Sequence, residues 1–550
     1  MRITNKIMQR NNLSNINTNK IYEDRLSTQM STEKKINRPS DDPVVAIRAL
    51  RLRSNVTEIT QYYSKNIPDA ESWLNVTEDS LTNLSGVLTK MIEQCTTGSN
   101  GTSKTSLTTK NRQIILEQLQ KLGEEVYSTG DADYAGRYVF TGYRTDTPLS
   151  FTTANKTRYE ITEQLDSSAV DKVTKVDTGE LLNINTSNYG QPPFDQVTDQ
   201  DISASECYRI RLAYNACSDY TRAAAGAKPT IEFLDTSAGL PGTTVTWTGT
   251  DIEVVNSYDK TTLTVTDPAT GAQKQVDPYT YASMNDDAIV YLPDTGEVLL
   301  GKNRYESLMK AKDIEGSPAN EGEIRVTYEK DDWLKGDLRP EHYFACKTFD
   351  ADNTADASVS YNEDYLDNTA KRQSIEYDIG FNQTIQVNST ADECFNHGIG
   401  REVDDIMRAM QDVLKLEAVK TDIESALSNV DENDAQAKKF LQNQLEAVEK
   451  GLTLAKEKEQ RLFEKGITSF QKHLDAANLS LTSCGARSSK LELVKNRTQN
   501  QKTTFETLKS ENEDIDITEV IVGLTAAELT YNASLMATGK VAQTTLLNYI

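Results

Sequence analysis

Histidine and paired cysteine, which most metal and acid–base sites require, are scarce in this chain of 550 residues. The three histidines, His342, His397 and His473, are scattered, and no HExxH motif occurs. No two of the six cysteines form a CxxC pair, so zinc binding and thioredoxin-like chemistry are not expected. Because the cysteines are widely spaced along a long chain, we predict free and mostly buried thiols rather than disulfides. They are Cys95, Cys207, Cys217, Cys346, Cys394 and Cys484.

Complete nucleotide-binding and calcium-binding motifs are also lacking. The stretch GEVLLGK at 296–302 fits the first part of a P-loop, but Asn303 stands where the magnesium-binding Ser or Thr is needed. The same region reads as a β-hairpin with PDTG as its turn. Asp131 and Asp133 begin like a calcium loop, yet Gly142 stands where the bidentate Glu is required. We therefore predict neither a phosphate site nor a calcium site in these stretches.

A thiol–imidazole pair is a further catalytic possibility that the sequence offers. Cys346 lies four residues after His342, and on a strand both side chains would face the same side. Nothing supplies the orienting group or the oxyanion site that nucleophilic catalysis needs. We predict no catalytic residue, no cofactor and no metal site, and we expect that the protein is not an enzyme.

Positive charge is in deficit, because 59 Lys and Arg residues stand against 83 Asp and Glu residues, a formal net charge of −24. Such a chain is a poor candidate for binding nucleic acid or anionic membranes. The charge is uneven: residues 1–60 have a balance of +5 and residues 511–550 a balance of −5. The two ends could pair side by side, although exposed charges alone add little energy.

Long apolar runs are missing as well. The N-terminal stretch MRITNKIMQRNNLSNINTNK has neither an apolar core nor a small-residue cleavage site, so it does not read as a Sec signal peptide. No window approaches the roughly 20 apolar residues of a membrane span. We expect a soluble protein, or one that leaves the cell by a route that reads no cleaved signal.

Apolar stripes with helical spacing stand at both ends of the chain. Hydrophobic residues make up only 37% of it, which favours parts that bury a single face. Within 72–130 the stripe has heptad spacing, and the polar stretch TTGSNGTSKTS at 96–106 is expected to join two antiparallel helices. The stripe consists of Leu74, Thr77, Leu81, Leu84, Leu88, Met91 and Cys95, followed by Ile115, Leu119, Leu122 and Val126.

The C-terminal part mirrors this pattern, with a break at SENEDID, residues 510–516. The stripe shifts by one residue after Gly485, which should disturb supercoil winding. The charged stretch 401–460 either lengthens the helical stem or forms a solvated side hairpin. The C-terminal stripes consist of Phe463, Ile467, Phe470, Leu474, Ala477, Leu481 and Cys484, then Leu491, Val494, Thr498, Gln501, Phe505 and Leu508, and finally Ile517, Val520, Leu524, Ala527 and Tyr531.

The middle of the chain, from about 151 to 395, is rich in Thr, Val, Tyr and Asp. Short alternating runs such as TTVTWTGTDIEVV and GEIRVTYEKDDW recur between turn residues, which predicts mostly antiparallel β structure. The expected fold class is therefore α+β. Long antiparallel, coiled-coil-like helices from both chain ends would form an elongated rod, and the β-rich insertion would project from it as an outer domain.

The stretch NRPSDDPVVAI near the start reads as a helix stop followed at once by a helix start. Pro39 disfavours helical geometry at Arg38, so the incoming helix should end there. Asp42 can cap a new helix whose first turn contains Pro43. The residues between them add oxygens and negative charge at the positive end of that helix. This helix-break motif comprises Pro39, Ser40, Asp41, Asp42 and Pro43.

Both ends of the chain resemble the flagellar hook-associated protein 3 family, flagellin-like proteins of the hook–filament junction. At the N-terminal end the resemblance rests on INRPSDDP at 36–43 and GRYVFTGYRTDTPLSF at 136–151. Towards the C-terminus, SIEYDIGFNQTIQVNSTADECF at 374–395 looks like the returning β-hairpin of that family. Residues 474–492 and 514–550 look like its two closing helices.

The resemblance implies three domains and a structural role. Residues 1–42 with 515–550 would form the terminal helical assembly domain, 43–150 with 371–514 the helical rod domain with its small β-hairpin, and 151–370 the β-rich outer domain. The protein would be an extracellular adaptor on which the filament is built, exported through the flagellar type III pathway without a cleaved signal.

The implied partners are further copies of the chain in a ring, the first hook-associated protein on the hook side, flagellin on the filament side and an export chaperone. No nucleic-acid or membrane partner is expected. Two other functions stay open. The protein could be a minor flagellin that polymerises alone, or a surface adhesin or glycan-binding protein that uses the β insertion. For the latter, Trp247 and Trp333 could offer aromatic platforms or lie buried in the core.

The chain ends are expected to fold only on assembly. A single helix pair formed by 1–36 and 516–550 would bury too little apolar surface to offset the conformational entropy of ordering it. We predict that both ends are disordered or frayed in the free monomer. The candidates for buried assembly contacts are Leu13, Ile16, Leu524 and Tyr531.

Overall fold

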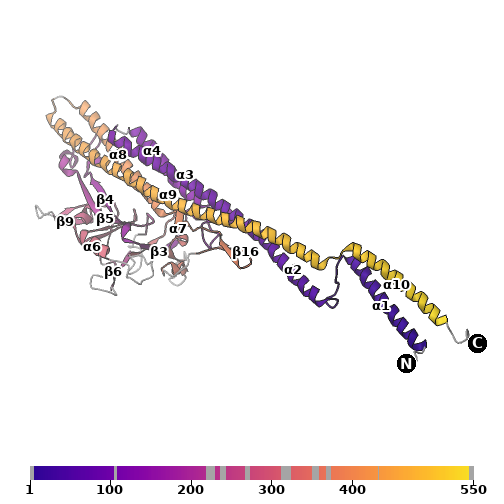
Figure 1. Ribbon diagram of the computed structural model, residues 1–550. Coiled ribbons are helices and arrows are strands. Elements are labelled where there is room, and N and C mark those ends of the chain that lie inside the picture. Colours follow the sequence, from indigo (N-terminus) through magenta and orange to yellow (C-terminus); the bar gives the residue numbers. More distant parts are fainter. Residues whose placement is uncertain are drawn as a thin grey trace, which may run out of the picture. The chain divides into compact units, whose positions relative to one another are not determined.

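The computed structural model describes residues 5–104, 108–218, 229–235, 243–249, 251–266, 273–310, 324–349, 358–366, 373–431 and 433–543 (Figure 1). The chain divides into two compact units. The first combines residues within 1–71, 376–385 and 487–550, and the second combines 72–375 with 386–486. The three-domain division expected from the sequence stays a prediction.

Long helices come from both ends of the chain, as predicted, and the fold class is α+β. The described helices are α1 (Asn5–Thr32), α2 (Pro43–Gln61), α3 (Ile67–Lys104), α4 (Thr109–Gly130), α5 (Pro278–Met284), α6 (Lys302–Lys310), α7 (Ala391–Cys394), α8 (His397–Asn429), α9 (Ala435–Glu513) and α10 (Ile517–Gln543). A π-helical turn, Tyr62–Asn66, connects α2 and α3.

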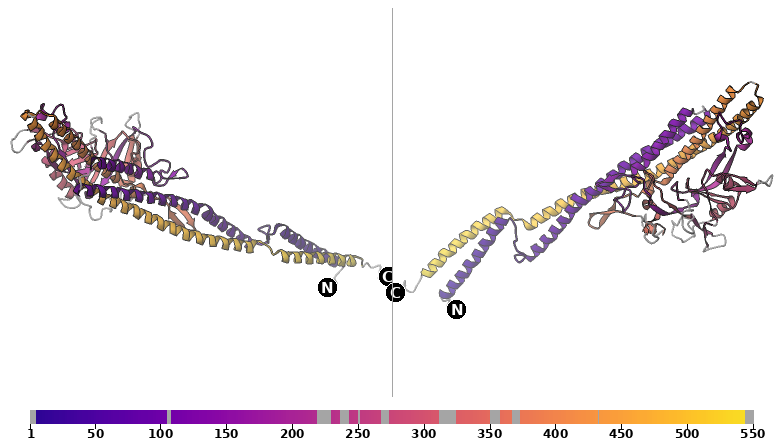
Figure 2. Two further views of the ribbon diagram at one scale, coloured as in Figure 1. Left: turned by 90° about the horizontal axis from the view of Figure 1, so that it is seen from above. Right: turned by 180° about the vertical axis from the view of Figure 1, so that it is seen from behind.

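In the first unit, α1 and α10 lie side by side in all views (Figures 1 and 2). A β-hairpin formed by β16 (Glu376–Gly380) and β17 (Gln383–Gln386) confirms the predicted returning hairpin. The Asn66 side chain donates a hydrogen bond to the backbone oxygen of Asp378 over 2.8 Å, and the rings of Tyr62 and Phe381 meet edge to face. The π-helical turn therefore packs against this hairpin.

In the second unit, the predicted heptad stripe of α3 is confirmed, because all seven of its residues are fully buried. Helices α3 and α4 are antiparallel, since Ser80 near the start of α3 donates to the backbone oxygen of Thr129 at the end of α4. One expectation was wrong: of the predicted loop 96–106, residues 96–104 are helical and continue α3, while 105–106 lie outside the described residues. Gly98 is buried there against the ring of Phe463, and this tertiary packing overrides the low helix propensity of the stretch.

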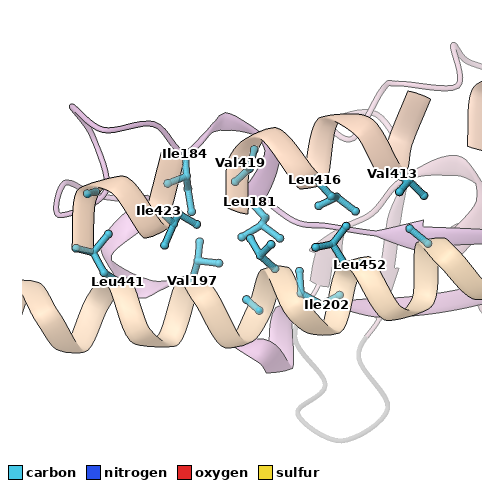
Figure 3. Close-up of a cluster of buried hydrophobic side chains, with 14 residues drawn as sticks. Leu181, Ile184, Val197, Ile202, Val413, Leu416, Val419, Ile423, Leu441 and Leu452 are labelled. Carbon is cyan, nitrogen blue, oxygen red and sulfur yellow. The ribbon is translucent and has the colours of Figure 1, made fainter. Parts of the chain in front are cut away.

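The charged stretch 401–460 forms an antiparallel hairpin of α8 and the first part of α9, continuous with the rest of α9. Its tip is not simply solvated, because apolar residues of both helices enclose residues of the segment 181–202 (Figure 3). In Figure 3, Leu181, Ile184, Val197 and Ile202 point between the two helices. The hairpin thus has a core of its own, which fixes it against the β-rich segment.

The β structure is mostly antiparallel, as predicted. A five-stranded sheet has the order β4-β5-β12-β11-β8, in which β8 and β11 are parallel, and a six-stranded sheet has the order β15-β14-β3-β13-β6-β7. Their strands are β3 (Arg158–Leu165), β4 (Val170–Asp177), β5 (Ser203–Arg211), β6 (Thr230–Asp235), β7 (Thr243–Trp247), β8 (Glu253–Val254), β11 (Ile289–Leu292), β12 (Glu297–Leu300), β13 (Ile324–Lys330), β14 (Ala345–Phe349) and β15 (Ser358–Tyr361). Two small hairpins consist of β1 (Asp133–Tyr134) with β2 (Arg137–Tyr138) and of β9 (Thr264–Thr266) with β10 (Gln273–Gln275).

Candidate assembly surface

The helix-break motif starts a helix as predicted. Asp42 has an extended backbone (φ −152°, ψ 100°), and its carboxylate accepts the N–H groups of Val44 and Val45 at 2.9 and 3.1 Å. Pro43 is the first helical residue of α2. The carboxylate of Asp41 accepts the N–H groups of Arg38 and Asn37, and these bonds lower its pKa. Pro39 and Ser40 are exposed within the preceding turn.

The incoming helix ends earlier than predicted, at Thr32 rather than at Arg38. Glu33 adopts a left-handed conformation (φ 55°), which stops the helix. The next residues pair with the connection between α9 and α10: Lys35 N–H donates to Glu513 O over 2.7 Å, and Ile515 N–H donates to Glu33 O over 3.2 Å. The end of α1 is therefore set by a partner some 480 residues away in the chain, which local sequence does not reveal.

The charges of the two chain ends also meet at this junction. Arg53 of α2 forms a bidentate ion pair with Glu513, with both N–O distances at 2.7 Å. The side chain of Glu513 is 4% exposed, whereas that of Arg53 is 55% exposed. Lys34 forms an ion pair with Asp514. The basic N-terminal segment thus lies against the acidic C-terminal segment within one chain.

The contact between α1 and α10 has a small apolar core. Leu26 of α1 packs with Val520 and Ala527 of α10, and Ile515 and Leu524 cover this cluster. Gly523 lies beside Leu26, and a Cβ atom at this position would be in ordinary van der Waals contact with it at 3.5 Å. The core is confined to the end of the pair that is close to the helix-break motif.

Away from this core, the side of α1 that faces α10 is largely polar. The half-buried or buried positions of α1 repeat at spacings of four and three, as in a heptad seam, but most of them carry Asn or Glu. The apolar residues of α1 therefore follow no regular heptad in the sequence. The seam consists of Asn12, Ile16, Asn19, Glu23 and Leu26.

The large apolar side chains of the pair point mainly away from it. Twelve of them on α1 and α10 are between 40% and 72% exposed. They are Ile7, Met8, Leu13, Ile21, Tyr22, Met30, Ile517, Ile521, Val522, Leu529, Leu535 and Met536. We refer to these residues as the outward apolar surface. Such density of exposed apolar residues is typical of a protein-interaction surface.

The four residues predicted to make assembly contacts differ in their exposure. Leu13 is 61% exposed and belongs to the outward apolar surface, whereas Ile16, Leu524 and Tyr531 are half-buried within the pair. Leu524 covers the core around Leu26. We did not predict a contact for Leu26, because the seam position seven residues before it is occupied by Asn19 and not by an apolar residue. The role of all four residues in assembly stays a prediction.

The expectation that no segment is apolar enough to span a membrane is wrong for helix α10. By length and composition, Ile517–Lys540 is apolar enough to cross a membrane, although Glu519 and Glu528 interrupt it. Frequent Ala, Val, Ile and Leu raise the mean hydropathy without forming one long apolar run. A helix whose outer side is covered by neighbouring subunits has the same composition, so this segment alone is weak support for a membrane protein.

The glycines of the P-loop-like stretch have structural reasons. The stretch includes strand β12 of the β11–β12 hairpin, as predicted. Gly296 has φ 64°, and a Cβ atom there would lie 1.8 Å from the backbone oxygen of Tyr214. At Gly301 a Cβ atom would lie 2.2 Å from the backbone oxygen of Asn285. Close backbone packing therefore accounts for both glycines without a phosphate.

The remaining candidate groups for chemistry or sugar stacking are buried. Burial raises the pKa of the Cys346 thiol and lowers the pKa of His342 to about 4, so the pair is neutral rather than a thiolate beside an imidazolium. Trp333 is fully buried and Trp247 is 5% exposed, so neither indole offers an exposed platform. All six cysteines are buried and free, as predicted.

Comparisons with known proteins confirm the resemblance that the end motifs indicated. Residues 3–145 match the family model of the bacterial flagellin N-terminal helical region. Over 172 residues, 30% of this chain, the sequence is 28% identical to flagellar hook-associated protein 3 of Salmonella typhimurium, and it covers 53% of that protein. The Escherichia coli protein of the same name is 28% identical over 148 residues, 27% of this chain and 45% of that protein.

Among solved structures, a putative flagellar hook-associated protein from Vibrio parahaemolyticus aligns over 86% of this chain and 100% of its own, with 12% identity and a TM-score of 0.34. The flagellar junction protein FlgL from Legionella pneumophila aligns over 82% of this chain and 99% of its own, with 13% identity and a TM-score of 0.23. The chain spans about half the length of the Salmonella and Escherichia relatives that it matches. The chain is thus similar to flagellar hook-associated protein 3, and its residues 3–145 are similar to the helical N-terminal region of bacterial flagellins.

Proposed function

We propose that this protein is a structural subunit of the bacterial flagellum that joins the hook to the filament. The observation that carries the proposal is the α1–α10 pair, which places polar residues on the facing side of α1 and apolar residues on the outside. An exposed apolar surface of this kind gains free energy when neighbouring subunits cover it. The similarity to hook-associated protein 3 supports the same role.

Deletion of the gene tests the proposal directly. The mutant cell should keep its hook, lose its filament and release filament subunits into the medium, which electron microscopy and immunoblotting of the medium would detect. Attached filaments and intact swimming in the deletion strain would contradict the junction role.

Complementation of that strain tests the outward apolar surface. We expect Ile21→Glu and Val522→Glu to abolish filament attachment, because each places a charge where a neighbouring subunit would bury an apolar group. Both residues are more than 60% exposed in the chain, so the circular dichroism spectrum of the monomer should not change. The matched control is Tyr258→Glu, because Tyr258 is 75% exposed in the second unit. This variant should restore swimming. Restored swimming with the first two variants would exclude this surface from assembly.

The partners in this role would be further copies of the chain in a ring, the first hook-associated protein on the hook side and flagellin on the filament side. The protein would transmit torque mechanically, without catalysing a reaction. It would be extracellular, at the hook–filament junction.

A minor flagellin is the alternative within the same architecture. That function would require the purified chain to polymerise by itself into long filaments. Under the junction proposal, electron microscopy of the concentrated chain should show at most small rings or short stacks of rings, and no long filaments.

Export through the flagellar type III pathway is part of the proposal. The uncleaved N-terminal segment would direct export, and a chaperone would hold the C-terminal helix before secretion. Removal of residues 2–30 should leave the protein in the cytoplasm. Secretion of the truncated chain at normal levels would contradict this route.

A further inference from the structure

A cavity of about 320 Å³ lies in the second unit. It is bounded by strands β4 and β5 on one side and by helices α8 and α9 on the other. Its volume is at the lower end of the range found for small-ligand sites. Residues from strands and helices far apart in the chain therefore form its wall.

Basic side chains dominate this cavity. Arg408 and Lys415 are seven residues apart on α8, and Lys458 and Lys465 are seven apart on α9, so each pair lies on one face of its helix. Lys175 of β4 adds a further cation. In total eight basic and three acidic residues line the cavity, in a chain whose net charge is −24. We call it the basic cavity.

Some of these cations are neutralised by carboxylates. Arg209 pairs with Asp171, Glu297 and Asp405 at 2.8 to 3.0 Å. Lys465 lies 2.7 Å from Asp171. These ion pairs connect the five-stranded sheet to helices α8 and α9, and the paired charges neutralise one another.

Among the described residues, three lysines of the basic cavity have no such partner, namely Lys172, Lys175 and Lys415. None of the three has a carboxylate oxygen of a described residue within 4.0 Å. The ammonium group of Lys175 lies 5.3 Å from the centre of the Tyr279 ring and that of Lys172 lies 5.2 Å from the centre of the Tyr208 ring, so each makes a cation–π contact instead of an ion pair.

Among the described residues, the one carboxylate that pairs with Lys458 is that of Asp412, at 3.9 Å. Burial lowers the pKa of Lys458, and although Asp412 raises it, the nearby charges of Lys175 and Arg408 lower it further.

We propose that the basic cavity binds a small ligand through a phosphate or sulfate group. Lysine ammonium groups around a partly enclosed space attract such a group, because charges of one sign that line a cleft act together on an anion. Thr174, Gln411 and Ser257 also line the cavity and can exchange hydrogen bonds with hydroxyl groups. The polar lining favours a sugar phosphate or sugar sulfate over the free inorganic ion.

Isothermal titration calorimetry of the full chain at low salt tests this inference, with glucose 6-phosphate, glucose 6-sulfate, inorganic phosphate and glucose as probes. We expect the two charged sugars to bind and glucose to give no heat. Inorganic phosphate binding as tightly as the charged sugars would support the oxyanion site but assign it to the free ion. No binding of any charged probe at millimolar concentration would overturn the proposal.

Charge variants assign the binding to this cavity. Lys175→Gln with Lys415→Gln should weaken binding at least about tenfold, since it removes two of the three lysine charges that have no carboxylate partner among the described residues. Lys121→Gln with Lys439→Gln removes two exposed lysines elsewhere in the same unit and should leave binding unchanged. Asp412→Asn should tighten binding, because it frees Lys458. Unchanged affinity in the first double variant, with an unchanged melting temperature, would exclude the basic cavity.

Discussion

At the scale of single residues, Glu163 has the environment with the clearest effect on stability. Its carboxyl group is buried in the six-stranded sheet, where it accepts hydrogen bonds from the Tyr328 hydroxyl and from the Ala213 N–H at 2.8 Å. Burial raises the pKa of Glu163 to about 7, because a low-dielectric environment disfavours the charged form. The folded chain thus holds a proton here more tightly than the unfolded chain does.

This shift gives a pH-dependent stability. A raised carboxyl pKa in the folded state favours folding fully below the unfolded pKa of about 4.5, and this contribution is lost as pH rises through 7. We predict that Glu163→Gln, which keeps hydrogen-bond acceptors but carries no charge, is more stable than the natural chain at pH 8. The expected gain is on the order of 2–3 kcal/mol at pH 8 and near zero at pH 4.5. Urea unfolding at both pH values measures it, and an equal effect at the two pH values would contradict the assignment.

Two glycines of helix α3 should respond oppositely to alanine. At Gly98 a new Cβ atom would lie 2.5 Å from the buried ring of Phe463, whereas at Gly86 no atom lies within 4 Å. We predict that Gly98→Ala destabilises the fold by about 1–3 kcal/mol through overpacking. Gly86→Ala, the matched control, should stabilise it by about 0.5–1 kcal/mol through helix propensity.

Thermal or urea unfolding of the two variants measures this difference. Phe463→Leu should relieve part of the cost of Gly98→Ala, because it removes the ring atoms that the new methyl group meets. Stabilisation by Gly98→Ala would show that the ring moves aside freely, and the close packing of α3 on α9 would then not explain the helical 96–104 stretch.

At the scale of helices, the start of α2 depends on one side chain. Asp42 satisfies two N–H groups that have no partner within the helix, and it lies at the positive end of the helix dipole. We predict that Asp42→Ala costs about 1 kcal/mol of local stability. Hydrogen exchange at the amides of Val44 and Val45 should become faster, while Asp42→Ser should retain most protection. Ser40→Ala is the control, and an equal effect of that variant would show that Asp42 is not the cap.

The α1–α10 pair illustrates how a helix can form without an inward apolar face. Asn and Glu occupy most seam positions of α1, and the apolar core is limited to the cluster around Leu26. Because hydrophobic burial provides most helix stability in proteins, a pair of this kind is weak without partners. Its ion pairs with the α9–α10 junction are partly exposed and add little.

At the scale of the whole molecule, this weakness predicts folding coupled to assembly. We expect the amides of residues 5–32 and 517–543 to exchange rapidly with solvent in a verified monomer, while the buried stripe of α3 stays protected. Under the proposed function, the same terminal segments should be protected in the assembled flagellum, because neighbours would then cover the outward apolar surface. Strong protection of both ends in the monomer would show that they fold without partners.

The sequence by itself determined the features that depend on local pattern. Heptad spacing in α3, alternation in the strands, the cap at Asp42 and the PDTG hairpin all follow from interactions between near neighbours. The end motifs likewise indicated the similarity to hook-associated protein 3. These features could be read because each residue's partner lies within a few positions or at a fixed period along the chain.

The tertiary structure alone decided the features whose partners are distant. The end of α1 at Thr32 depends on backbone bonds to 513–515, and the helical course of 96–104 depends on packing of Gly98 against Phe463. The basic cavity combines lysines from β4, α8 and α9 that nothing in the sequence relates to one another. Local propensity cannot encode such contacts, because their energy arises only when segments hundreds of residues apart come together.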